Sequence, residues 1–143
     1  MITLPQQLMA GSALVVLLLG SLHLLYTFRG KKLYPRDTHL ERQMDLVSPV
    51  LTSRTTMWRA WIGFNASHSF GAMFFGLVYG YLALAQPEVL FHSHYLILLG
   101  LVLLAGYVFL AKAYWFRIPL AGVLLSTGLY LAALVARWHG SGE

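Results

Sequence analysis

The chain has 143 residues, of which 58% are hydrophobic and only 10% are charged. Soluble domains carry about 25% charged residues, so this composition predicts a protein whose apolar surface faces lipid. Cysteine is absent, which excludes disulfides, thiolate metal sites and cysteine nucleophiles within these residues. The net charge of +5 raises the question of nucleic acid binding, and the positions of the basic residues answer it.

Apolar segments predict an all-α membrane protein, with four transmembrane helices forming one bundle domain over residues 1–143. The expected spans are 8–28, 57–85, 95–111 and 119–135. The first is an uncharged run of 21 residues, and at 1.5 Å per residue it crosses about 30 Å of hydrocarbon. Basic residues follow this run rather than precede it, so we expect a membrane span rather than a cleaved signal peptide.

The segment 29–56, between the first two spans, is expected to be a loop that contains a short helix over 38–47. Thr38 and Glu41 fit a capping box. Apolar residues then recur at helical spacing at Leu40, Met44 and Val47. Such a helix would lie in the membrane interface, with its charged side in water and its apolar side on lipid. The alternative interpretation is an irregular loop.

Basic residues are distributed unevenly along the chain. Of the ten lysines and arginines, seven lie within 29–59 and two within 112–117, and only Arg137 lies on the opposite side of the predicted membrane. Basic loops stay on the cytoplasmic side, so we expect a multi-pass protein of the cell membrane or an inner membrane, with both termini outside. Topology and anionic lipid headgroups therefore account for the charge without nucleic acid.

Polar residues inside a membrane are costly unless they have partners, and most of them lie in the second span. At 100° per residue, one face of that helix carries Trp61, Asn65, His68 and Ser69. The other side carries Gly63, Ser67 and Gly71 at four-residue spacing, a pattern that lets another helix approach closely.

The candidate ligand-binding site consists of the polar face of the second span, His23 of the first span and Tyr130 of the fourth. The residues of that face are Trp61, Asn65, His68 and Ser69. Sites in helical bundles are built from side chains on facing helices, and we expect a hydrophobic or amphipathic small molecule such as a lipid or a quinone. A second copy of the chain or a partner membrane subunit could instead dock through the glycine positions. The simplest alternative is that His23, Asn65 and His68 only hydrogen-bond across helices.

No aspartate or glutamate lies within any expected span, which argues against carboxylate proton transfer or acid-liganded metal chemistry in the membrane. No catalytic residue is assigned. The two histidines within spans, His23 and His68, permit a second interpretation in which they hold one b-type haem or a quinone in a membrane oxidoreductase or a small membrane enzyme.

Three further histidines, His92, His94 and His139, lie beyond the expected ends of the spans. Imidazole is a common ligand of Zn²⁺ and Cu²⁺, but this spacing is not a specific metal motif. Solvated interfacial side chains are the simpler interpretation, so no metal site is predicted.

Overall fold

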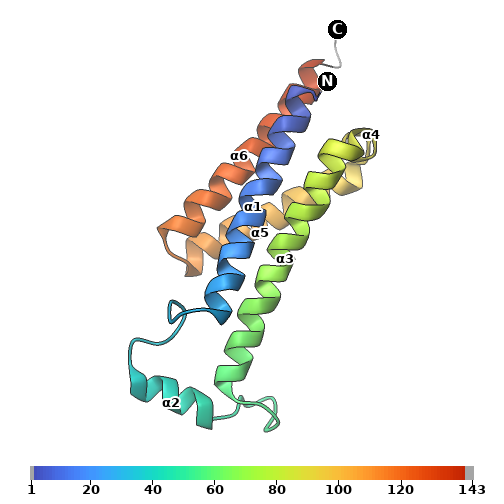
Figure 1. Cartoon of the computed structure of the whole chain (residues 1–143). Helices are drawn as coiled ribbons and strands as arrows, with labels where there is room; N and C mark the ends of the chain where they lie inside the picture. Colours follow the sequence, from blue (N-terminus) through green and yellow to red (C-terminus); the bar gives the residue numbers. More distant parts are fainter. Residues whose placement is uncertain (1, 141–143) are drawn as a thin grey trace. The chain divides into compact units, whose positions relative to one another are not determined.

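The computed structural model describes residues 2–140, which contain six helices and no strand (Figure 1). The helices are α1 (Leu4–Phe28), α2 (Thr38–Leu46), α3 (Met57–Ala85), α4 (Pro87–His92), α5 (His94–Tyr114) and α6 (Arg117–Gly140). Four of them, α1, α3, α5 and α6, are long and apolar enough to cross a membrane. The predicted fold class, including the short helix after the first span, is confirmed, and the chain is a small polytopic membrane protein.

The ends of the spans differ from the expected ones, except for the second span, whose bounds agree. Helix α1 begins four residues earlier than expected, and the Gln6 side chain caps its start: Gln6 Oε1 accepts from the Thr3 amide at 2.7 Å and from the Thr3 hydroxyl at 2.9 Å. Helices α5 and α6 also extend past the expected apolar runs, since polar and aromatic residues at a membrane interface continue the helical backbone.

Two shorter helices lie between the spans. The cap of α2 is Asp37 rather than the expected Thr38, because the Asp37 carboxylate accepts from the His39 amide at 2.8 Å and thereby satisfies one unpaired donor of the first turn. Helix α4 lies between the expected second and third spans, where no helix was predicted. Pro87 occupies its first turn, where a missing backbone N–H costs nothing.

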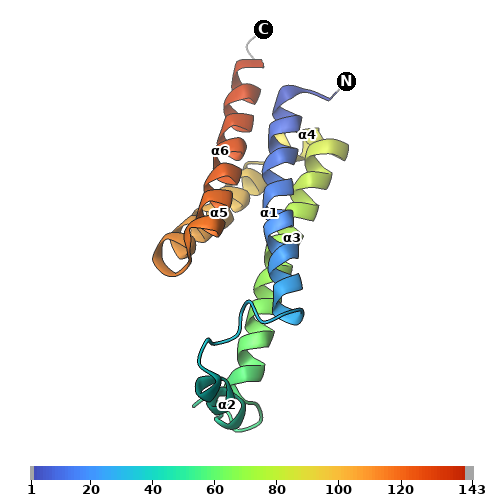
Figure 2. The ribbon, with the colours of Figure 1, turned by 60° about the vertical axis from the view of Figure 1, so that its left-hand side comes forward.

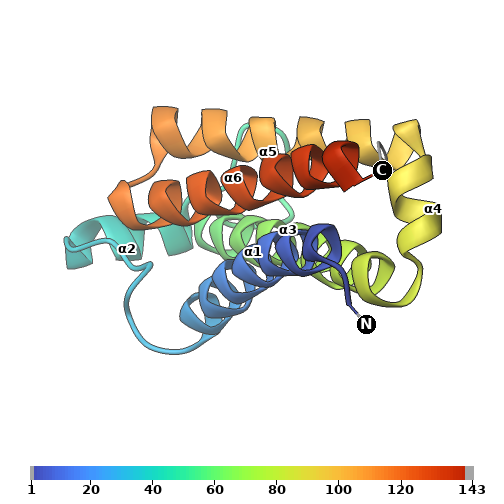
Figure 3. The same ribbon diagram turned by 90° about the horizontal axis from the view of Figure 1, so that it is seen from above.

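The structure separates into two compact units, and the first comprises residues 2–19 and 72–140. In this unit α5 and α6 form a hairpin, seen from two directions in Figures 1 and 3, and α4 connects α3 to α5. Close packing depends on small residues. An added Cβ at Gly76 would stand 2.6 Å from Leu17 Cβ and 2.7 Å from the Ala13 carbonyl oxygen, so only glycine allows α1 and α3 to approach this closely.

The second unit comprises residues 20–71, with α2 and its flanking loops beside the ends of α1 and α3 (Figure 2). Two hydrogen bonds hold the loops to α3. The Trp61 indole N–H donates to the Leu33 carbonyl at 3.1 Å, and the Met57 amide donates to the Val47 carbonyl at 2.8 Å. These bonds fix the segment before α3, where backbone groups would otherwise lack partners.

Candidate functional site

Three predicted site residues meet in the second unit, and Asn65 organises them. Asn65 is 8% exposed, and its Nδ2 donates to the Trp61 carbonyl one turn earlier at 2.8 Å. A carbonyl can only accept, so this bond fixes the orientation of the amide and leaves Oδ1 directed away from the helix backbone. Oδ1 lies 3.0 Å from His23 Nε2.

The orientation of Asn65 selects the tautomer of a neutral His23 ring. Because Oδ1 has no hydrogen, His23 must donate from Nε2, and the neutral imidazole then carries its lone pair on Nδ1. Among the described residues no hydrogen bond to His23 Nδ1 is present. The structure therefore leaves a hydrogen-bond acceptor near the C-terminal end of α1, on a ring whose other nitrogen is occupied.

His68 lies against the same imidazole. The two ring centroids are 5.5 Å apart and the ring planes are 86° to one another, an edge-to-face contact. The predicted grouping of His23, Asn65 and His68 on facing sides of α1 and α3 is thus present as geometry, and His68 is only partly exposed. Ligand binding by these residues stays a prediction.

Other polar side chains of this region bond to backbone carbonyl oxygens. Ser69 is fully buried and donates to the Asn65 carbonyl at 2.9 Å. Thr27 donates to the His23 carbonyl at 2.8 Å. The Trp61 ring, 41% exposed, is directed to the loop that carries Leu33 rather than to the histidines. Ser69, Thr27 and Trp61 therefore position the cluster more than they extend it.

Tyr130, the remaining predicted site residue, belongs to the first unit. It is completely buried, and its hydroxyl donates to the Ile97 carbonyl at 3.0 Å. Its ring also fills the space beside Gly100, where an added Cβ would stand 2.5 Å from the Tyr130 hydroxyl oxygen. Tyr79 makes a parallel bond to the Leu96 carbonyl at 2.6 Å. Both tyrosines join their helices to the first turns of α5.

The predicted ridge of small residues faces outward. Gly63, Ser67 and Gly71 are all exposed, and an added Cβ at Gly63 would meet no atom within 4 Å. The Ser67 hydroxyl donates to the Phe64 carbonyl of its own helix at 2.9 Å. The opposite side of α3, with Asn65 and Ser69, is the buried one, as the helical pattern predicted.

The histidines expected beyond the ends of the spans follow a different pattern, although His139 lies in the last turn of α6. His92 bonds to Glu88 and Arg137, and His139 Nδ1 lies 2.9 Å from the Val135 carbonyl oxygen. Within residues 2–140, no group of three or more histidine, aspartate or glutamate side chains is placed to hold a metal ion.

Comparisons with protein family models, with curated proteins and with solved structures give no match to this chain.

Proposed function

We propose that this polytopic membrane protein binds an amphipathic small molecule, a quinone in its reduced quinol form or a lipid, whose polar head hydrogen-bonds at the cluster of His23, Asn65 and His68. The proposal rests above all on the bond between Asn65 Oδ1 and His23 Nε2, which fixes His23 with an acceptor nitrogen inside an apolar protein. In an apolar environment, an acceptor nitrogen without a partner is stabilised most by a ligand that donates a hydrogen bond from a hydroxyl or an N–H.

A quinol hydroxyl or a lipid glycerol hydroxyl matches this acceptor. Apolar residues of α1 flank the histidine along the helix, among them Leu22, which is 48% exposed, and Leu25, which is 46% exposed. An isoprenoid or acyl tail would lie along such a surface while the head meets the imidazole. One fixed polar group beside an extended apolar surface is the combination expected for an amphipathic ligand.

The haem interpretation fits the geometry less well. His23 Nε2 carries the proton that it donates to Asn65, so this nitrogen cannot ligate iron while the bond exists. The edge-to-face contact at 5.5 Å also puts the two imidazoles directly against each other. A bis-histidine haem needs both rings to face the iron from opposite sides of the porphyrin, so His23 would have to ligate through Nδ1 and the contact between the two rings would have to break.

Quinone binding is tested by titrating the purified protein, in mild detergent, with a decyl-substituted benzoquinol and following tryptophan fluorescence. Lipids and quinones that copurify are identified by mass spectrometry of the same preparation. His68→Gln and Asn65→Leu should each weaken binding about two- to tenfold, the equivalent of one hydrogen bond. Ser67→Ala, on the exposed side of the same helix, is the matched control and should bind like the parent.

Unchanged affinity in both His68→Gln and Asn65→Leu would remove the site and leave these residues as interhelical contacts. An absorption spectrum of the parent protein tests the haem interpretation. A Soret band that disappears in His68→Gln would establish that His68 is an axial haem ligand.

A second candidate function is association with a partner subunit or a second copy of the chain through the ridge of Gly63, Ser67 and Gly71. The exposure of all three residues supports this candidate function, since small residues on the surface of a membrane helix permit close contact with another helix. Ser67→Leu should then convert a larger species into a monomer in detergent, measured by light scattering. A monomeric parent in lipid nanodiscs would argue against self-association.

A further inference from the structure

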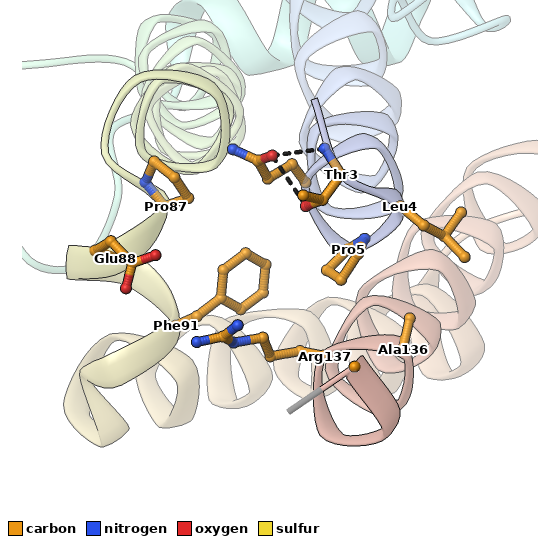
Figure 4. A pocket seen from close by; sticks show the side chains of 10 residues that line it. Thr3, Leu4, Pro5, Pro87, Glu88, Phe91, Ala136 and Arg137 are labelled. Atoms are coloured by element: carbon orange, nitrogen blue, oxygen red, sulfur yellow. Dashed lines mark hydrogen bonds between the residues drawn. The ribbon is translucent and has the colours of Figure 1, made fainter. Parts of the chain in front are cut away.

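The first unit contains a pocket at one end of its membrane-spanning helices. None of the residues that line it belongs to the cluster of His23, Asn65 and His68. It has a volume of about 370 Å³ and lies between the start of α1, helix α4 and the end of α6 (Figure 4). Small-molecule sites typically measure about 300 to 1,000 Å³. Leu4, Pro5 and Phe91 give it an apolar lining, and Gln6, Glu88 and Arg137 give it polar groups.

A chain of hydrogen bonds holds the two charged residues of the pocket. Arg137 Nη2 lies 3.4 Å from His92 Nε2, and arginine can only donate, so the His92 proton lies on Nδ1. His92 Nδ1 is 3.0 Å from Glu88 Oε2 and 2.9 Å from the Glu88 carbonyl oxygen. The guanidinium and the carboxylate are thereby kept at the same pocket, one on α6 and one on α4.

Donor and acceptor capacity remains after these bonds are counted. A guanidinium has five N–H donors, and the bond to His92 uses one of them. Gln6 Oε1 accepts from the Thr3 amide and hydroxyl, at 2.7 and 2.9 Å, while its NH₂ group has no partner among the described residues. The pocket therefore offers donors from Arg137 and Gln6 and one further acceptor oxygen on Glu88.

We propose that this pocket binds the headgroup of a zwitterionic phospholipid with a primary ammonium, that is, a phosphoethanolamine lipid. The phosphate accepts from Arg137 and Gln6, because arginine matches phosphate oxygens with its parallel donors. The ammonium donates to Glu88. A headgroup that carries both charges satisfies both residues at once, whereas a purely anionic headgroup would meet the Glu88 carboxylate.

The position of the pocket favours a lipid over a soluble phosphoamine. It lies where membrane-spanning α1 begins and α6 ends, the level at which headgroups lie. Its apolar lining is open to the surroundings, since Leu4 is 59% exposed. Acyl chains from a bound headgroup would cover such residues, so the same molecule accounts for the charged and the apolar parts of the surface.

The test uses the full chain in nanodiscs that contain equal amounts of phosphatidylethanolamine, phosphatidylcholine and phosphatidylglycerol. The lipids that stay bound after transfer to detergent are counted by native mass spectrometry. Phosphatidylethanolamine should be retained in preference to the other two. Arg137→Gln should reduce its retention about tenfold, the usual loss for a hydrogen bond to a charged group.

Glu88→Gln should act differently and abolish the preference for phosphatidylethanolamine over phosphatidylcholine, whose quaternary ammonium has no proton to donate. Arg117→Gln is the matched control, because Arg117 lies exposed at the other end of α6 and should leave retention unchanged. Arg137→Lys keeps the charge and loses the paired donors, so it should retain an intermediate amount of lipid and show that the fold is intact.

Equal retention of the three lipids by the parent, or equal retention of phosphatidylethanolamine in Arg137→Gln and the parent, would overturn the proposal. Glycerophosphoethanolamine, which has no acyl chains, separates the two sources of the headgroup. It should displace bound lipid only at far higher concentration than the intact lipid. Displacement at the same concentration would assign the pocket to a soluble phosphoamine and overturn the assignment to lipid.

Discussion

The two units use their intramembrane polar groups in different ways. In the first unit, hydroxyl groups bond across helices: Ser126 donates to the Ser12 carbonyl at 3.0 Å, and Tyr130 donates to the Ile97 carbonyl. These hydroxyl-bearing side chains are all completely buried. In the second unit, an imidazole and an amide meet at partly buried positions, and one acceptor nitrogen of His23 remains.

This difference indicates which polar groups hold the fold and which are suited to bind a ligand. A hydroxyl has one proton, so Ser126, which donates to a carbonyl, must accept from Ser12 at 2.8 Å in the bond between the two hydroxyls. No donor of that pair is left for another molecule. An imidazole has two nitrogens, and fixing one of them prepares the other.

The units also differ in the number of basic residues near the ends of their spans. The topology that this difference predicts can be tested by cysteine labelling. The chain has no cysteine, so Lys32→Cys, Glu88→Cys and His139→Cys each report one position. The excess of basic residues in 29–59 predicts that positions 88 and 139 react with an impermeant maleimide in intact cells and that position 32 reacts only after lysis. The opposite pattern would reverse the topology.

Packing in the first unit should show the largest effect on stability. Gly76→Ala places a methyl group against the Ala13 carbonyl oxygen and Leu17, so the backbones must separate at a cost of about 1 to 3 kcal/mol. Gly63→Ala on the same helix meets nothing within 4 Å and is the matched control. Unfolding in mixed detergent micelles measures both variants. Equal stabilities would mean that α1 and α3 do not depend on this contact.

The hydroxyl pair of the first unit should contribute less than the packing. Ser126→Ala removes both bonds to Ser12 and leaves a buried hydroxyl without its acceptor, which we expect to cost about 1 kcal/mol of unfolding free energy. Thr127→Val is the control, because Thr127 donates only to the Val123 carbonyl of its own helix. A loss as large in the control would mean that the interhelical bonds carry no special weight.

The spans were predictable because each is a long apolar run between polar or proline-containing segments. The second span, from Met57 to Ala85, had its bounds correct since Gln86 and Pro87 end the helix. Helix α4 was not predicted, because six residues contain too little periodicity to separate a helical turn from a loop. The early start of α1 was missed although Thr3 and Gln6 carry a recognisable capping pattern.

The site was only partly predictable for a related reason. The helical period places Asn65 and Ser69 on one side of α3, and both are buried. The meeting of Asn65 with His23 depends on the register between α1 and α3, which the pattern of one helix does not contain. Tyr130 was grouped with the histidines as a polar residue of the fourth span, while its hydroxyl bonds to the first turn of α5.

The smallest effect on unfolding free energy is expected for the hydrogen bond between His23 and Asn65, on which the proposed function rests. Its size tests most directly whether the two units differ in the role of their polar groups. A double-mutant cycle with His23→Leu and Asn65→Leu should give a coupling of about 0.6 kcal/mol in unfolding free energy, the average for hydrogen bonds in membrane proteins. The cycle of Ser12→Ala and Ser126→Ala should give a larger value, since that pair is completely buried and makes two bonds. A coupling above about 1.7 kcal/mol for His23 and Asn65 would exceed the known range of such bonds. In that case the amide and the imidazole would hold α1 and α3 together as firmly as the serines do, and the assignment of binding to one unit and of cohesion to the other would be wrong.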